Sequence, residues 1–180
     1  MYRNILLTGV PGIGKTTLLR RVLDKIEVKA GGFYTEEIRE KGKRVGFSIK
    51  TLDGRTGMLA HVNHRGPHRV GKYGVNIEDL EAVASESVRS AIEKDDLVVI
   101  DELGRMELYS PLFQKVVKGA LGSGKPVLGT IQIRRNRFLD SIRARDDVKV
   151  VEVTSGNRDA LVESVARELA SLLGRLNRND

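Results

Sequence analysis

The stretch GVPGIGKTT, from Gly9 to Thr17, matches the phosphate-loop pattern G-x-x-x-x-G-K-[ST] in full. In such a loop the glycines let the backbone N–H groups point inward, Lys15 neutralises the outer phosphates, and the Thr16 hydroxyl ligates magnesium. A glycine-rich turn without a ligand is the alternative, but it would not require the strand that precedes this stretch and the helix that follows. The sequence therefore predicts a site for a magnesium nucleotide, made of Gly9, Val10, Pro11, Gly12, Ile13, Gly14, Lys15, Thr16 and Thr17.

A second apolar stretch, LVVIDE, ends in two carboxylates, Asp101 and Glu102. A buried strand bears charge at its end, where metal and water can reach it. We expect Asp101 to hold the magnesium through its water shell, opposite Thr16. Glu102 points to another face of the strand and is the candidate for polarising an attacking water. For either carboxylate alone, a helix cap or an ion pair with arginine is the alternative.

The segment DELG, Asp101 to Gly104, also fits the D-x-x-G pattern of switch GTPases. The guanine-reading pattern N-K-x-D is absent, and its nearest imitation, NRDA from Asn157 to Ala160, lacks the final acid. Selective recognition of GTP is therefore not predicted. We expect instead that the base is recognised loosely.

The elements that must position these residues alternate along the chain. Strands are expected at 3–8, 33–40, 45–52, 57–62, 96–101, 126–132 and 148–154, and helices at 16–26, 76–93, 110–121, 135–145 and 158–176. Residues 63–73 are expected to form a basic loop. Alternating strands and helices predict an α/β fold with a three-layer, mostly parallel sheet, into which the strands between 33 and 62 insert an antiparallel meander.

Length and composition indicate one domain over residues 1–180, since 180 residues with 40% hydrophobic content suffice for one core. No apolar run approaches the roughly 18 residues that span a bilayer, and the first four residues show no signal-peptide pattern. The absence of cysteine agrees with a reducing compartment. We expect a cytoplasmic protein with no membrane partner and, by default, a monomer.

The net charge of +7 raises the question of a nucleic-acid partner. Only 4% of the residues are aromatic and none is tryptophan, so a platform for stacking bases has little material. Nucleic-acid binding is therefore left open but unsupported. Nucleotide phosphates and surface ion pairs are the alternative partners for the charge.

The segment DELGRMEL, from Asp101 to Leu108, together with GGFYTEE, GKYGVN and TSGNRD, resembles a family of small nucleoside-triphosphatases known from thermophiles and from a cancer-related human relative. The resemblance covers almost the whole chain. It implies a RecA-like phosphate-loop NTPase core in which one strand separates the two motif strands. It also implies Mg²⁺-dependent hydrolysis of ATP, GTP and other triphosphates, with broad base tolerance. Two positions depart from the pattern: Arg105 replaces a common lysine, and Gln132 stands where proline is usual.

Further candidates follow from charge and position. Arg105, within the acidic motif, is the first candidate for stabilising charge in the transition state, and Glu107 for orienting Arg105 or water. Asn157 and Arg158 are expected beside the base, with helix capping as the alternative. Two basic clusters are candidates for closing over the triphosphate, namely Arg65, Arg69 and Lys72, and Arg134, Arg135 and Arg137. The three histidines His61, His64 and His68 lack the spacing of a zinc site.

The sequence thus favours a nucleoside-triphosphate phosphohydrolase, with weaker activity on diphosphates. Two other classes remain open at this point. A small nucleotide or nucleoside kinase would use the same loop, with Glu102 activating a substrate hydroxyl. A nucleic-acid-binding module with vestigial ATP use would show steeply salt-dependent binding to oligonucleotides.

Overall fold

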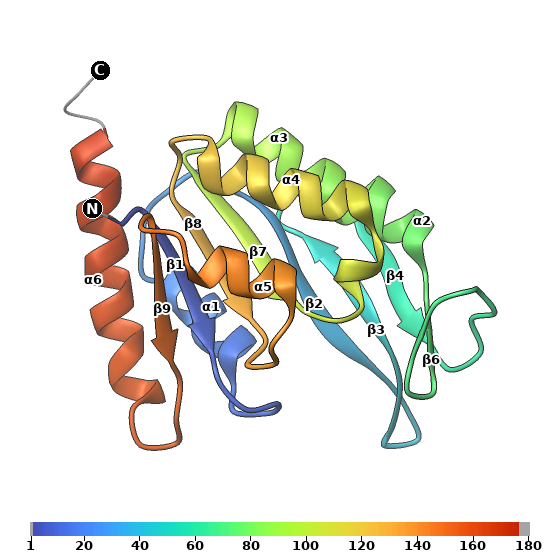
Figure 1. Cartoon of the computed structure of the whole chain (residues 1–180). Helices are drawn as coiled ribbons and strands as arrows, with labels where there is room; N and C mark the ends of the chain where they lie inside the picture. Colours follow the sequence, from blue (N-terminus) through green and yellow to red (C-terminus); the bar gives the residue numbers. More distant parts are fainter. Residues whose placement is uncertain (1, 177–180) are drawn as a thin grey trace.

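The computed structural model describes residues 2–176, which form one nine-stranded sheet with helices on both faces (Figure 1). The order of the strands across the sheet is β5-β6-β4-β3-β2-β7-β8-β1-β9. The parallel half contains β2 (Ala30–Glu40), β7 (Leu97–Leu103), β8 (Val127–Ile131), β1 (Asn4–Thr8) and β9 (Val148–Glu152). The antiparallel half continues from β2 through β3 (Lys43–Thr51), β4 (Thr56–His61), β6 (Tyr73–Val75) and β5 (Arg69–Val70).

The strand β8 lies between the two strands that carry the motifs. It pairs in parallel with β1 on one side, where Leu128 faces Ile5, and with β7 on the other, where Leu128 faces Val99. The carboxyl ends of β1, β8 and β7 therefore meet at the same edge of the sheet. This edge is where open α/β sheets place their ligands. The single strand between the motif strands, implied by the family resemblance, is confirmed.

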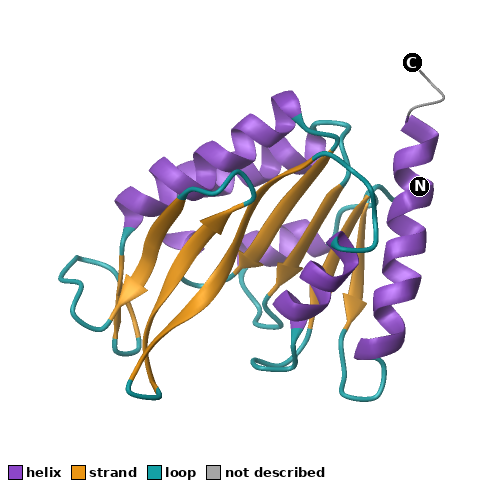
Figure 2. Ribbon diagram, turned by 180° about the vertical axis from the view of Figure 1, so that it is seen from behind, coloured by secondary structure: helices purple, strands orange, loops and turns teal. Residues whose placement is uncertain are grey.

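Helices cover both faces of the sheet and give the predicted three layers. One face carries α1 (Lys15–Leu23) and α6 (Arg158–Leu176), which runs along the β9 end of the sheet (Figure 2). The other carries α2 (Ile77–Asp79), the π-helical segment η1 (Leu80–Ser85), α3 (Glu86–Lys94), α4 (Pro111–Gly122) and α5 (Arg137–Arg143). A short 3₁₀ turn, η2 (Glu107–Tyr109), precedes α4.

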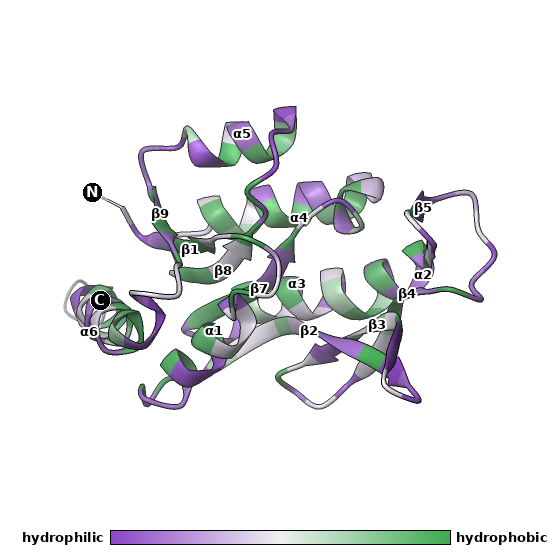
Figure 3. Ribbon diagram, turned by 90° about the horizontal axis from the view of Figure 1, so that it is seen from below, coloured by the Kyte–Doolittle hydropathy of each residue, from purple (hydrophilic) through white to green (hydrophobic). Residues whose placement is uncertain are grey.

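The apolar core is divided by the sheet into two clusters. Along β7, Val98 and Ile100 pack towards α3 and α4, whereas Leu97 and Val99 pack towards α1 and α6. A strand buried on both faces is apolar at every position rather than at alternate ones, which explains the uninterrupted run LVVI. Figure 3 shows these apolar strands between α4 and α5 on one side and α1 and α6 on the other.

Several sequence-based boundaries were wrong. The strand expected at 33–40 begins at Ala30, since residues 30–33 pair with β7. Residues 63–73 are not all loop, because β5 and β6 form a hairpin whose two-residue turn holds Gly71 at φ +58°. The helix after Asn76 is interrupted by the π-helical segment. The first helix ends at Leu23 rather than at Ile26, because the N–H groups of Lys25 and Ile26 bond three residues back, in a tighter turn.

The described residues 2–176 contain no helix that combines the length and the apolarity needed to cross a membrane.

Candidate active site

The phosphate loop joins β1 to α1, and its backbone requires glycine at two turns. Gly12 and Gly14 adopt φ of +80° and +102°, a region that residues with a Cβ rarely enter. Lys15 begins α1, is only 9% exposed, and donates from Nζ to the carbonyl oxygen of Gly9 at 3.1 Å. The lysine ammonium is therefore held over the loop, as a phosphate-binding role requires.

Asp101 lies at the centre of a hydrogen-bond network that links three elements. The Thr16 hydroxyl of α1 donates to Asp101 Oδ2 at 2.7 Å, and the Thr130 hydroxyl of β8 donates to Asp101 Oδ1. The carboxyl group is fully buried, and this burial raises its pKa to about 6, although the two hydroxyls and a backbone hydrogen bond from Thr35 oppose the shift. A bound cation would favour the ionised form.

The donor atoms at this point fit magnesium. Mg²⁺ prefers oxygen ligands, usually one or two from the protein together with waters and substrate phosphates. The Thr16 hydroxyl and the Asp101 carboxylate supply such oxygens 2.7 Å apart, at the end of the loop. Thr130 was not identified from the sequence. The polar pair at positions 130 and 132 of an apolar strand was the signal that could have found it.

Glu102 has different surroundings from its neighbour. Its Oε1 accepts a hydrogen bond from Gln132 Nε2 at 2.7 Å, and its Oε2 lies 3.8 Å from Lys15 Nζ. The side chain is 25% exposed, whereas Asp101 is completely buried. One carboxylate thus faces the hydroxyl of the magnesium-binding position and the other faces the phosphate-binding lysine. This geometry matches the division of roles expected from the sequence.

Arg105 and Glu107 follow the acidic pair but lie in different environments. Arg105 is exposed, while Glu107 is only 4% exposed. Burial, together with the nearby charges of Glu102 and Asp101, raises the pKa of Glu107 to about 8. The raised pKa favours the protonated form of Glu107 and so weakens it as an ionic partner for Arg105. Its role in orienting water stays a prediction.

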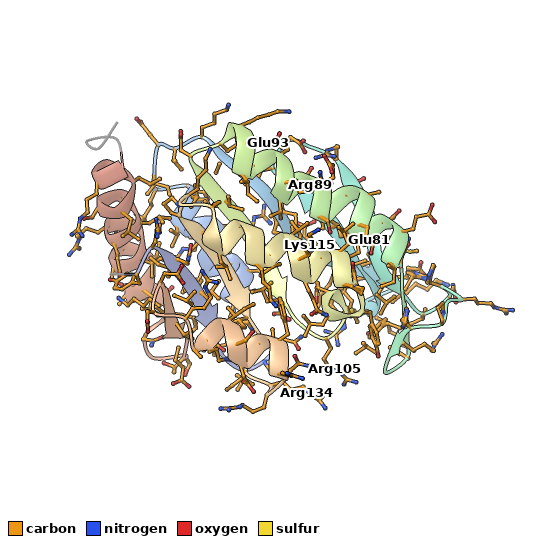
Figure 4. All side chains as sticks on the ribbon, turned by 45° about the horizontal axis from the view of Figure 1, so that its top comes forward. Glu81, Arg89, Glu93, Arg105, Lys115 and Arg134 are labelled. Atoms are coloured by element: carbon orange, nitrogen blue, oxygen red, sulfur yellow. The ribbon has the colours of Figure 1, made fainter. Side chains whose placement is uncertain are left out.

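The two basic clusters lie at different distances from the loop. Arg134, Arg135 and Arg137 directly follow β8, the neighbour of both motif strands. Arg69 and Lys72 belong to the β5–β6 hairpin, whose two strands lie seven and six positions from β1 in the sheet. This hairpin contacts η2, where the Tyr109 hydroxyl donates to the Arg69 carbonyl oxygen at 3.1 Å. Arg105 and Arg134 project from the same end of the molecule (Figure 4). The cluster after β8 is therefore the better placed of the two.

A cavity of about 250 Å³ adjoins the loop on the side of α1 and α6. It is lined by Gly14, Thr17, Leu18, Arg21, Arg158 and Asp159. Arg21 and Asp159 form an ion pair at 2.8 Å across it. A larger hollow of about 430 Å³ lies between Tyr2 and α6, at the amino end of β1, and so away from the loop.

Asn157 and Arg158, the residues expected beside the base, differ in how they are placed. Arg158 lines the cavity. The amide of Asn157 closes its own loop, accepting from Thr154 N at 2.8 Å and donating to Glu152 O at 2.9 Å. The amide therefore stabilises the loop before α6 rather than capping the helix, because its backbone donor, Thr154, precedes α6.

The three histidines, all in the described part of the chain, do not form a metal site. Within residues 2–176 no group of three or more histidine, aspartate or glutamate side chains is arranged to hold a metal ion. His68 instead stacks on Tyr109, with ring centroids 4.6 Å apart.

The loop, the acidic strand and the strand between them define a phosphate-loop nucleotide-binding protein with a RecA-like sheet. The model of the NTPase family matches residues 4–166, and the chain belongs to that family. It is 47% identical over 161 residues to the nucleoside-triphosphatase THEP1 of Thermotoga petrophila, covering 89% of each chain.

Two solved structures are similar along nearly their whole length. The crystal structure of THEP1 from the hyperthermophile Aquifex aeolicus has a TM-score of 0.85 and 32% identity, covering 92% of this chain and 98% of that one. The solution structure of a human cancer-related nucleoside triphosphatase has a TM-score of 0.80 and 38% identity, with coverage of 94% and 98%. The family resemblance predicted from the motifs is confirmed.

Proposed function

We propose that the chain hydrolyses nucleoside triphosphates to the diphosphate and phosphate, with Mg²⁺ as cofactor. The observation that carries the proposal is the 2.7 Å contact between the Thr16 hydroxyl and the Asp101 carboxylate, with Glu102 turned towards Lys15 beside it. The phosphate loop, the proposed cation ligands Thr16 and Asp101, and the separate carboxylate of Glu102 thus lie together at the carboxyl ends of the strands. The names of the relatives, which are nucleoside-triphosphatases, support the same activity.

The residues divide the work of phosphoryl transfer to water. The loop N–H groups and Lys15 bind the outer phosphates, and Thr16 and Asp101 would hold the cation. Bound magnesium supplies charge neutralisation at the phosphates. Glu102 orients and polarises the attacking water. Arg105 and Arg134 are the residues proposed to stabilise the negative charge that develops on the leaving oxygen.

The cavity beside α1 supports a loose recognition of the base. Its 250 Å³ is smaller than the roughly 300–1,000 Å³ of pockets that enclose a whole ligand, so a nucleoside would be only partly covered. The Asp159 carboxylate at its rim is paired with Arg21 rather than free for a base edge. We therefore propose broad tolerance among ATP, GTP and other triphosphates. Diphosphates leave the outermost phosphate position empty and should react more slowly.

Phosphate release from a panel of nucleoside tri- and diphosphates, with Mg²⁺ and with EDTA, tests the proposal. We expect release from all common triphosphates only with Mg²⁺, at a rate that added nucleosides do not change. The control is Lys15→Ala, which removes the charge on the outer phosphates and should abolish turnover without unfolding the protein. Parental hydrolysis by Lys15→Ala would contradict the site. Transfer of phosphate to an added nucleoside would identify a kinase.

The cytoplasmic location and the monomeric state remain part of the proposal.

A further inference from the structure

The side chain of Gln132, which directly follows β8, contacts both Glu102 and the backbone of Arg105 in the acidic motif. Gln132 donates from Nε2 to Glu102 Oε1 at 2.7 Å, and its Oε1 accepts from the backbone N–H of Arg105 at 3.2 Å. A single amide thus contacts the candidate base and the backbone of the candidate arginine. The family resemblance left the role of this strand end open, because proline is usual there.

The main chain at Gln132 is fixed from two sides. Its N–H donates to the carbonyl oxygen of Leu103 at 3.0 Å, and its carbonyl oxygen accepts from the guanidinium of Arg143 on α5. Arg143 is in turn paired with Asp140 at 2.9 Å. The amide is therefore presented to Glu102 from a rigid attachment at the edge of the sheet, rather than from a free loop.

Gly104 provides the space for this contact. A Cβ at position 104 would lie 2.4 Å from Gln132 Nε2 and 2.9 Å from Glu102 Oε1. Both separations are too short for non-bonded atoms, so any side chain there would displace the amide. Glycine at position 104 thus leaves room for the hydrogen bond between Gln132 and Glu102 in this chain.

The two partners of Glu102 act differently when a nucleotide enters. Lys15 Nζ, 3.8 Å from Glu102 Oε2, must turn to the phosphates. The amide of Gln132 is uncharged, so the phosphates do not attract it away from Glu102 as they attract the lysine ammonium. We propose that Gln132 is a positioning residue, whose amide holds the Glu102 carboxylate towards the attacking water and ties the Arg105 backbone to the same point. This inference rests on the proposed function.

Steady-state kinetics with Mg-ATP in four single variants and one double variant test the inference. Gln132→Met keeps the length of the side chain but removes the amide, and we expect kcat to fall about tenfold or more, equivalent to roughly 1.4 kcal/mol. KM should stay within about twofold, because Gln132 holds the base and not the substrate. Gln132→Glu, which sets a carboxylate against Glu102, should lower kcat further.

A double-mutant cycle separates positioning from a structural role. Adding Gln132→Met to Glu102→Gln should cost much less than Gln132→Met costs in the parent, because the part of its effect that acts through the Glu102 carboxylate is already lost and only the contact with the Arg105 backbone remains. The matched control is Gln114→Met, since Gln114 also donates its amide, to the Leu108 carbonyl oxygen at 2.9 Å. This control should change the unfolding temperature more than kcat.

The possible results distinguish the two proposals. Parental turnover in Gln132→Met, or losses that add up in the double variant, would overturn the positioning role and leave the hydrolase intact. A parent that releases no phosphate from any triphosphate overturns the proposed function and the inference with it. If Gln114→Met loses as much activity as Gln132→Met, the loss in Gln132→Met reflects lower stability of the fold rather than positioning of Glu102. That result would also overturn the inference.

Discussion

At the scale of single residues, the site is built from two adjacent carboxylates with contrasting neighbours. Asp101 is completely buried and accepts hydrogen bonds from two threonine hydroxyls, which are neutral donors. Glu102 is partly exposed and lies against a lysine and an amide. Different roles were expected from the sequence because neighbouring side chains in a regular strand diverge. In the structure a cis peptide bond joins the two residues, and it is their different partners, rather than strand alternation, that distinguish the two carboxylates. The two roles stay a prediction. The partner Thr130 lies in β8 and Gln132 directly after it. Two polar positions mark this strand end in the sequence, but spacing along the chain does not show which carboxylate each side chain contacts.

The two carboxylates should therefore respond differently to loss of charge. Glu102→Gln keeps the shape, so the affinity for the magnesium nucleotide should change little. Turnover should fall by at least about a hundredfold, since a positioned base contributes about 10² to 10⁴. Asp101→Asn should instead raise the magnesium concentration needed for activity. Calorimetry of nucleotide binding beside phosphate release measures both effects. Turnover above about a tenth of the parental rate in Glu102→Gln would remove it as the base.

At the scale of elements, the decisive feature is the loop between β8 and α5. It is anchored by Arg143, which donates to the backbone carbonyls of Gln132 and Arg134, and by the cap of α5, where Asn136 accepts from Phe138 N at 2.8 Å. Arg135 is paired with Asp140 at 3.1 Å. Arg134 and Arg137 are both exposed, and Arg134 is the one nearer along the chain to the end of β8. We therefore take Arg134 as the member of this cluster to test first.

Arg134→Ala and Arg105→Ala should each slow turnover, and the matched control Arg69→Ala, in the distant hairpin, should not. An arginine that stabilises developing charge contributes mainly to kcat, so we expect losses of about tenfold or more for the first two. Comparing kcat and KM for Mg-ATP in the three variants measures the difference. An equal loss in Arg69→Ala would mean that the hairpin reaches the nucleotide and that our placement of the basic clusters is wrong.

The elements also show what the sequence could not provide. The phosphate loop, its flanking strand and helix, and the alternating strands were predicted because each has a local pattern of glycine or apolar residues. The β5–β6 hairpin was missed because strands of two and three residues are too short to show alternation. The placement of β8 between β7 and β1 was implied only by the family resemblance, since the order of parallel strands depends on packing across the whole sheet.

At the scale of the whole molecule, the place proposed for the nucleoside is a cavity between elements far apart in the sequence, α1 and the start of α6. Contacts from Leu18, Thr17 and the paired Arg21 and Asp159 offer little that would distinguish one base from another. We expect kcat/KM values for ATP, GTP, CTP and UTP to agree within about a hundredfold, or roughly 2.7 kcal/mol. Competition between pairs of nucleotides measures this ratio. A larger preference for GTP would indicate that Asp159 leaves Arg21 to bind the guanine edge.

The stability of the whole fold should depend on the protonation of Glu107. Burial raises the pKa of this carboxyl from 4.5 to about 8, so the folded state keeps a proton that the unfolded chain releases. Below about pH 4.5 Glu107 is protonated in both the folded and the unfolded state, so it does not make the free energy of unfolding depend on pH. As pH rises from there to about 8, ionisation of the unfolded chain lowers the free energy of unfolding, by up to about 1.4 kcal/mol per pH unit.

Glu107→Gln mimics the protonated carboxyl and should remove this dependence. Urea unfolding in EDTA at pH 5 and pH 8 should show a parent that is weaker at pH 8 by a few kcal/mol. The variant should lose much less, and at pH 8 it should be the more stable protein. A smaller dependence below about pH 6 should persist in both, because burial also raises the pKa of Asp101. The exposed Glu152, changed to glutamine, is the matched control and should keep the parental difference. Equal losses of stability between pH 5 and 8 in the parent and in Glu107→Gln would show that Glu107 does not retain its proton in the folded state.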